Sequence, residues 1–341
     1  MPDSPLKVCN ACGRVYEKLE NFFTNTSRWR MCQNGHLWFN CSCDSTNMLL
    51  KGKFDWYSPE RFMTQESRSL FNTIPKIKEL PQLPTYVMEL QQLIQQEQTT
   101  AKQLAEMSKK APVLASKILE IANRKAGPKA SRIESLEHAI AYLGISILQD
   151  IIMVASLQSI TIQTQVFKID DFWEDAFATG RVAEALAIRF APHLSPDKAY
   201  IAGTLCNIGK LVLALYSPND ADLITKEIHD VKILGTWQEA EKRHSIPSHT
   251  ALGEIGGSFW GIPEYVLDAI MLHHQIPQVV TKKTRISLEG VVSLANQMSH
   301  WLQLKPSEID QKVFQGWLKI FQLDNQSAEE FIAKMLELKV A

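Results

Sequence analysis

The sequence lacks an excess of charge of either sign. Its 341 residues include 36 Lys and Arg against 37 Asp and Glu, which gives a formal net charge of -1 at pH 7. A chain so balanced has no overall field that would draw it to nucleic acid or to an anionic membrane surface. Only a local basic patch could serve either purpose.

Long uncharged apolar runs are also missing. A membrane-spanning helix needs about 18 or more such residues, whereas the most apolar segment, Ile145 to Ile162, is interrupted by Gln149, Asp150 and Gln158. The N-terminal residues MPDSPLKVCNACG contain no apolar run behind a basic start, which a secretory signal would have. We therefore expect a cytoplasmic protein with no membrane contact and, from its 45% hydrophobic content, a well-formed core.

Cysteine is nearly absent after residue 43. Five of the 6 cysteines lie up to that point, and the sixth is Cys206. In a reducing compartment such a cluster indicates metal binding rather than disulfides. The two-residue spacing of Cys9 and Cys12 aims both thiolates at one ion, and a hairpin turn at Asn34-Gly35 would bring the later cysteines near. The predicted zinc ligands are Cys9, Cys12, Cys32, Cys41 and Cys43.

Tetrahedral zinc takes four ligands, so these five thiols and His36 offer more than the ion needs. Cys9, Cys12 and Cys43 are the preferred ligands, and Cys32 and Cys41 compete for the last position. The alternative is a redox-active CxxC pair. Such a pair normally lies in a βαβ context, which is missing here.

The fold class expected from the pattern is mainly α. Strand-like alternation is scarce after residue 60, and from Leu80 onward apolar residues recur at spacings of three and four. We predict a small β zinc-ribbon-like domain over residues 1–57, a linker over 58–78, an all-helical domain over 79–290 and a C-terminal helical extension over 291–341 packed on it. The first domain has little core of its own, so zinc would supply much of its folding free energy.

Start and stop signals support the helical reading of the main body. A hydroxyl at a helix start accepts a hydrogen bond from a free backbone N–H, and a glycine just past the end permits a left-handed residue. The predicted caps are Thr100, Ser131, Ser195 and Ser327, and the predicted stops are Gly127 and Gly144.

Several segments in a fixed order resemble the HDOD family, the HD-related output domain of bacterial signalling proteins. They are LPQLPTYVMELQQLI from Leu80, APVLASKILEIANRKAG from Ala111, IESLEHAIAYLGISILQDIIM from Ile133, and then AGTLCNIGKLVL and HTALGEIGGSFWGIPEYVLDAIMLHH. The resemblance covers roughly residues 79 to 280. It departs from the family pattern at Ala111, where Asp is usual, and at Arg124, where Ser is usual. It implies an all-helical HD-like fold and a role in signal transduction.

The same resemblance implies a hydrolase site that has lost its metal ligands, which we call the relic pocket. Catalytic HD proteins carry a helix close to "AGLLHDIGK", in which adjacent His and Asp bind a divalent ion. Cys206 and Asn207 fill those two places here, and a neutral amide cannot replace an anionic carboxylate that bridges hard cations. By motif order the relic pocket comprises Asp175, Cys206, Asn207, Lys210, His249, His273, His274 and Asn296, with no catalytic residue among them.

The individual side chains also have plain structural interpretations. Adjacent residues on a helix diverge by about 100°, so we expect only one of His273 and His274 to point inward. Asn207 is expected to form a hydrogen bond across the former metal cavity, because a buried amide left unpaired would cost roughly 1–3 kcal/mol. Cys206 is expected to be a small buried hydrophobe. Lys210 either pairs with Asp175 or receives a phosphate or carboxylate, and we favour the pairing.

Three classes of function fit these observations. The leading one is a non-catalytic signalling or regulatory module that binds protein partners, with a nucleotide as the other ligand class. A residual metal-dependent phosphodiesterase using His249, His273 and His274 is the first alternative. The second is nucleic-acid binding through the zinc segment, whose basic and aromatic residues are Lys7, Arg14, Lys18, Arg28, Arg30, Lys51, Lys53, Trp29, Trp38 and Phe39.

Overall fold

A computed structural model gives the fold of the chain. It describes residues 7–9, 12, 14–16, 26–31, 37–41, 43, 46–49, 67, 69–70, 80–94, 96, 98–127, 130–230, 235–275, 286–302 and 308–340. The described residues fall into two compact units. The first takes its residues from Met1–Phe62, Pro81–Ile160 and Trp260–Glu264, and the second from Met63–Leu80, Thr161–Phe259 and Tyr265–Ala341. The protein is mainly helical, as predicted.

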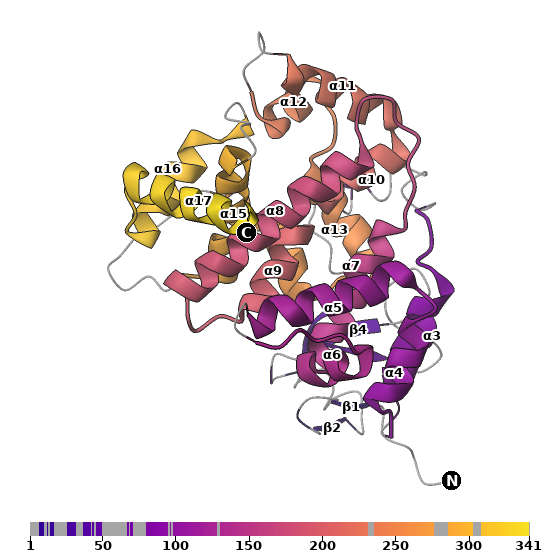
Figure 1. Cartoon of the computed structure of the whole chain (residues 1–341). Coiled ribbons are helices and arrows are strands. Elements are labelled where there is room, and N and C mark those ends of the chain that lie inside the picture. Colours follow the sequence, from indigo (N-terminus) through magenta and orange to yellow (C-terminus); the bar gives the residue numbers. More distant parts are fainter. Residues whose placement is uncertain are drawn as a thin grey trace. The chain divides into compact units, whose positions relative to one another are not determined.

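The first unit begins with short antiparallel strands. β1 (Lys7–Val8) pairs with β2 (Val15–Tyr16), and β3 (Thr26–Met31), β4 (Leu37–Cys41) and β5 (Thr46–Leu49) form a sheet in the order β3-β4-β5. Five helices follow: α3 (Thr85–Ile94), α4 (Ala101–Ser108), α5 (Pro112–Ala126), α6 (Leu136–Leu143) and α7 (Ile145–Gln158). Within this unit α5 packs on α6 and α7 (Figure 1).

The second unit holds the remaining helices. They are α8 (Ile169–Phe190), α9 (Pro196–Leu205), α10 (Ile208–Tyr216), α11 (Pro218–His229), α12 (Trp237–Arg243), α13 (His249–Trp260), α14 (Glu264–Leu272), α15 (Leu288–Leu302), α16 (Gln311–Phe321) and α17 (Asn325–Val340). The long helix α8 packs on α9 and α15 (Figure 1). One buried cluster joins Ala187 of α8 and Val291 of α15 to Leu318 of α16 and Ile332 of α17. The C-terminal helices therefore contribute to this core.

Most of the predicted helix ends are confirmed. Thr100 forms a full capping box with Gln103, Ser195 caps α9, and Gly127 and Gly144 end α5 and α6 with φ near 80°. Two predicted caps are wrong. α6 begins after Ser135 rather than Ser131, and the Asp324 carboxylate, not the Ser327 hydroxyl, accepts from a backbone N–H at the start of α17.

One glycine lets two helices of the second unit come unusually close. A Cβ at Gly209 on α10 would lie 1.7 Å from the carbonyl oxygen of His249, the first residue of α13. Real Cβ atoms never approach so closely, so only glycine fits. The close approach brings the start of α13 next to the Cys206-Asn207 turn that precedes α10.

The described residues contain one helical stretch, Pro196–Tyr216, that is long and apolar enough to span a membrane by length and composition. A second would count only if the bent pair α6 and α7 formed one span. Within the first stretch, 78% of the apolar window is buried inside the protein. The core helix of a folded domain passes the same test, so this stretch is weak evidence for a membrane span.

Candidate functional site

Three histidines of the second unit converge on one point. His249 Nε2 lies 3.4 Å from His273 Nε2 and 3.0 Å from His274 Nε2. The ligand atoms of all three lie within 4.8 Å of one another. We call these residues the histidine cluster. His249 and His273 are fully buried, and His274 is partly exposed.

The prediction that His273 and His274 point apart is wrong. It assumed a continuing helix, but α14 ends at Leu272 and both histidines lie in the turn that follows. Because the rotation of about 100° per residue applies only within a helix, it does not separate these two side chains. Their ring centroids lie 4.0 Å apart. Both reach His249.

A buried carboxylate that we did not predict holds the ring of His249. Glu241 on α12 is 2% exposed, and its Oε1 accepts from the backbone N–H of His249 at 2.7 Å. The same atom lies 2.9 Å from His249 Nδ1 and accepts from Trp237 Nε1 at 2.9 Å. The available signal was a charged residue four positions after Trp237, on the apolar face of a short helix.

These contacts fix the proton positions on two of the rings. Because a carboxylate only accepts, the neutral tautomer of His249 that fits this contact has its proton on Nδ1 and a lone pair on Nε2. His273 Nδ1 lies 2.8 Å from the carbonyl oxygen of Ile270 and 3.2 Å from that of Ala269. A carbonyl only accepts, so His273 also donates from Nδ1 and keeps a lone pair on Nε2.

Burial keeps His273 and His274 uncharged. Desolvation lowers the pKa of His273 and of His274 well below the usual value for histidine, and the neighbouring imidazoles and the Lys210 charge lower both further. Near pH 7 both rings are therefore neutral and present lone pairs. Neutral imidazole is the form that binds metal ions.

The two residues at the former metal pair are structural. Cys206 is fully buried at the end of α9, donates from Sγ to the carbonyl oxygen of Gly203 at 3.2 Å, and has a pKa that burial raises to about 12. Asn207 donates from Nδ2 to Asn296 Oδ1 on α15 at 2.7 Å. The predicted hydrogen bond of Asn207 across the cavity is thus present. Its Oδ1 is buried with no hydrogen-bond partner among the described residues.

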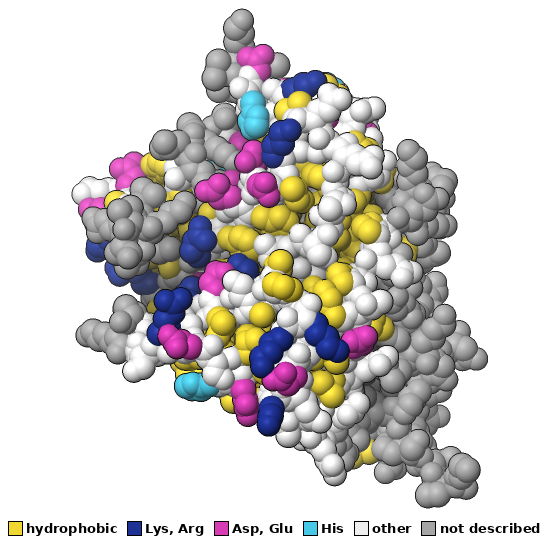
Figure 2. Space-filling view, turned by 45° about the vertical axis from the view of Figure 1, so that its right-hand side comes forward, with side chains coloured by type: hydrophobic (Ala, Val, Ile, Leu, Met, Phe, Trp, Pro, Cys, Tyr) yellow, Lys and Arg dark blue, Asp and Glu magenta, His cyan; other side chains and the backbone are white. Residues whose placement is uncertain are grey.

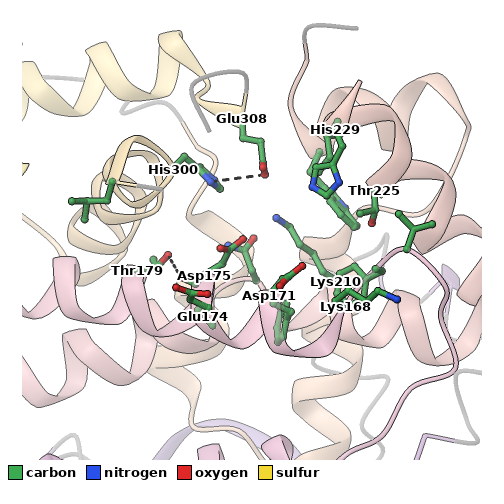
Figure 3. A pocket seen from close by; sticks show the side chains of 18 residues that line it. Lys168, Asp171, Glu174, Asp175, Thr179, Lys210, Thr225, His229, His300 and Glu308 are labelled. Carbon is green, nitrogen blue, oxygen red and sulfur yellow. Dashed lines mark hydrogen bonds and ion pairs between the residues drawn. The ribbon is translucent and has the colours of Figure 1, made fainter. Parts of the chain in front are cut away.

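A cavity of about 350 Å³ in the second unit opens onto Asn207 (Figure 3). Asp171, Glu174 and Asp175 line it from α8, and Lys210 points into it from α10. Lys210 Nζ lies 4.8 Å from the ring centroid of Trp237. This contact is a cation–π interaction, and the pairing of Lys210 with Asp175 stays a prediction.

Three of the predicted zinc ligands lie together in the first unit. The ligand atoms of Cys9, Cys12 and Cys43 lie within 4.8 Å of one another, and Cys9 Sγ is 3.7 Å from Cys43 Sγ. Cys9 is buried, whereas Cys12 and Cys43 are exposed. Of the other candidates, Cys32 lies outside the described residues, and Cys41 ends β4 without a described side chain.

Comparison with known proteins identifies the family. Residues 80–276, more than half of the chain, match the HDOD domain. The chain belongs to the HDOD domain family. An uncharacterized protein of Treponema pallidum (strain Nichols) is 22% identical over 225 residues, which are 63% of this chain and 41% of that protein. The chain thus spans less than half the length of that relative.

Solved structures share the fold. An HDOD domain protein of unknown function from Geobacter sulfurreducens is 20% identical with a TM-score of 0.56, over 80% of this chain and 93% of that one. A proposed phosphohydrolase from Shewanella amazonensis SB2B is 21% identical with a TM-score of 0.55, over 76% and 92%. A proposed signal transduction protein from Marinobacter aquaeolei VT8 is 20% identical with a TM-score of 0.54, over 76% and 57%.

Proposed function

We propose that the chain is a non-catalytic signalling module that acts by binding protein partners. The observation that carries this proposal is the bond between Asn207 and Asn296, two neutral amides at the places where an HD hydrolase has carboxylates. The neighbouring Cys206 is a neutral thiol. Of the described residues, the two groups with metal-binding geometry contain only cysteine or histidine. Hard ions such as Mg²⁺ and Mn²⁺ need oxygen ligands, which neither group offers.

The test is a turnover assay on the full chain. Protein supplied with Mg²⁺, Mn²⁺ or Zn²⁺ is incubated with bis(p-nitrophenyl) phosphate and with cyclic dinucleotides. We expect no release of product above the buffer blank. Metal-dependent turnover that disappears in His249→Ala would reject the proposal in favour of a residual phosphodiesterase. Two observations support that alternative: the histidine cluster, and the fold shared with a proposed phosphohydrolase.

The cavity lining supports protein partners over a nucleotide. Asp171, Glu174, Asp175 and Glu308 line it against the two lysines Lys168 and Lys210. A phosphate group would meet more negative than positive charge there. One solved relative that shares the fold is a proposed signal transduction protein.

The charges on the face in Figure 2 give no support to nucleic-acid binding. On the face in Figure 2, basic and acidic side chains are intermingled with hydrophobic ones, and no basic patch forms among the side chains drawn there in colour. Of the basic and aromatic candidates in the N-terminal segment, only Arg14 has a described side chain. A cytoplasmic location stays a prediction.

We also propose that the N-terminal cysteines hold a structural zinc ion in a ribbon-like domain. With bonds of 2.3 Å, tetrahedral zinc separates two sulfurs by about 3.8 Å. Cys9 and Cys43 already stand at 3.7 Å. Cys12 completes a set of three thiolates, and Cys32 or Cys41 would supply the fourth.

A further inference from the structure

The histidine cluster contains a conflict that hydrogen bonds do not resolve. In their neutral forms His249 and His273 each donate from Nδ1, to Glu241 or to a backbone carbonyl, and keep a lone pair on Nε2. The two Nε2 atoms lie 3.4 Å apart, and in that form neither can donate to the other. A buried arrangement of that kind is unfavourable unless a third group accepts both lone pairs.

Protonating His274 on Nε2 settles only half of the conflict. His274 could then donate to His249 Nε2 at 3.0 Å. That bond uses the single lone pair of His249 and leaves His273 Nε2 without a donor. It also leaves His274 Nδ1 as a bare acceptor, and that atom is buried with no hydrogen-bond partner among the described residues.

A cation at the centre of the cluster satisfies all three Nε2 atoms at once. Tetrahedral zinc with Zn–N bonds of 2.0–2.1 Å separates its nitrogen ligands by about 3.3 Å. The two separations from His249 Nε2, 3.0 and 3.4 Å, lie on either side of this value. These two separations therefore match the spacing of nitrogen ligands in a zinc site, and the ligand atoms of all three histidines lie within 4.8 Å of one another.

We propose that His249, His273 and His274 bind a single zinc-like divalent transition-metal ion through their Nε2 atoms, with Glu241 as the positioning residue that holds the ring of His249. Metal-binding histidines commonly donate their other N–H to a carboxylate or a backbone carbonyl. Glu241 provides the first arrangement, and Ile270 provides the second for His273.

The ligand set selects the kind of ion. Three neutral imidazoles suit Zn²⁺, Cu²⁺, Ni²⁺ or Co²⁺, whereas Mg²⁺, Ca²⁺ and Mn²⁺ prefer oxygen ligands. A site with three protein ligands leaves a fourth position for water or a small anion. The site goes beyond the proposed function, since it requires neither turnover nor a second ion. It would tie together α12, the start of α13 and the turn after α14.

The experiment uses the full chain with Cys9, Cys12, Cys32, Cys41 and Cys43 all replaced by serine, so that the N-terminal thiols do not contribute. The protein is equilibrated with zinc, dialysed, and analysed for zinc content by mass spectrometry. We expect about one zinc ion per chain. Adding His274→Ala should abolish retention, and adding His138→Ala, an exposed histidine on α6, should leave it unchanged. The proposal would be overturned if the chain without N-terminal cysteines retained no zinc. It would also be overturned if adding His274→Ala left zinc retention unchanged.

If His274→Ala disturbs the fold, the substitution Glu241→Gln still tests the proposal. Glu241→Gln preserves the volume of the side chain and an oxygen acceptor, so helical circular dichroism should stay intact. Removing the carboxylate beside His249 Nδ1 should weaken zinc affinity about 10- to 100-fold. Equal affinity in Glu241→Gln and in the parent would refute the positioning role. Zinc binding without turnover agrees with both proposals, whereas zinc-dependent turnover rejects only the proposed function.

Discussion

Asn207 and Asn296 are two members of the relic pocket that meet in a neutral contact. Their side chains, from the turn before α10 and from α15, join through one buried hydrogen bond of 2.7 Å. In an HD hydrolase, charged ligands and metal ions would occupy this space. A neutral amide pair needs no counter-ion, so this contact between the turn before α10 and α15 does not depend on a metal ion.

The first prediction concerns this pair. Asn207→Ala leaves Asn296 Oδ1 buried without its donor, so we expect a loss of about 1–3 kcal/mol in the free energy of unfolding. The double variant Asn207→Ala with Asn296→Ala should lose less than the sum of the two single losses, since both remove one bond. Urea denaturation measures all three variants. Additive losses would mean that the hydrogen bond contributes nothing.

Asp222 on α11 supports the wall of the cavity and gives a prediction about pH. Its carboxylate accepts from the backbone N–H groups of Gln165, Val166 and Phe167 at 2.8–2.9 Å. Burial would raise the pKa of Asp222, but these three hydrogen bonds outweigh burial and lower it. The stabilisation by Asp222 is therefore complete above the pKa that an aspartate has in the unfolded chain, about 3.9. It is lost as the pH falls through the lower pKa of Asp222 in the folded protein.

The measurement is acid unfolding of the parent and of Asp222→Asn. The amide cannot ionise, and it sets an N–H against backbone donors, so the variant should be less stable at pH 7 by about 2 kcal/mol. Below pH 3 the difference between the two proteins should shrink. A difference that stays constant down to pH 2 would contradict the assigned role.

At the scale of elements, the sequence predicted the helices better than their junctions. The predicted caps at Thr100 and Ser195 and the glycine stops at Gly127 and Gly144 are correct. These features follow from local periodicity and backbone preference, which a single sequence displays. The turn after Leu272 depends on where a helix ends, and Glu241 depends on which helix lies opposite. Neither property is local, so the sequence named the three histidines as members of the relic pocket but did not predict that both His273 and His274 reach His249.

The capping box of α4 offers a matched pair of substitutions. The Thr100 side chain accepts from Gln103 N–H, and the Gln103 side chain accepts from Thr100 N–H. Thr100→Ala should cost about 1 kcal/mol. Ser131→Ala, at the position wrongly predicted to be a cap, should change stability by less than about 0.5 kcal/mol. Thermal or urea unfolding measures both, and equal effects would be unexpected.

Gly209 links the packing of two helices to the histidine cluster. Because a Cβ there would collide with the backbone of His249, Gly209→Ala should push α13 away from α10 at a cost of about 3 kcal/mol. It should also displace His249 and so weaken zinc binding by the cluster. Gly235→Ala is the control, since a Cβ there would meet only the ends of the Arg243 and Glu239 side chains, both at 3.1 Å. A Gly209→Ala protein with parental stability would contradict the close approach.

At the scale of the whole molecule, two metal-binding geometries of different chemistry lie in the two compact units. Thiols occupy the first unit and imidazoles the second. The units share one chain, but a strong chelator should affect them unequally. Zinc would provide much of the folding free energy of the small N-terminal segment, whereas the helical unit has its own large core.

Limited proteolysis with and without a chelator measures this difference. We expect removal of zinc to expose cleavage sites within the first 57 residues while the helical family region stays intact. Cys12→Ser should have the same effect without a chelator. Cys206→Ala, which removes the only cysteine outside the N-terminal cluster, should not. Cleavage that begins in the helical region would contradict a structural role for the N-terminal thiols.

The buried thiol of Cys206 has a practical consequence for chemical labelling. Alkylating reagents attack the thiolate, and a fully buried thiol whose pKa is about 12 supplies almost none at neutral pH. Iodoacetamide applied to the native protein should therefore modify only N-terminal cysteines, and zinc-bound sulfurs should react slowly. The extent of alkylation thus reports metal occupancy in one part of the chain, without interference from the other.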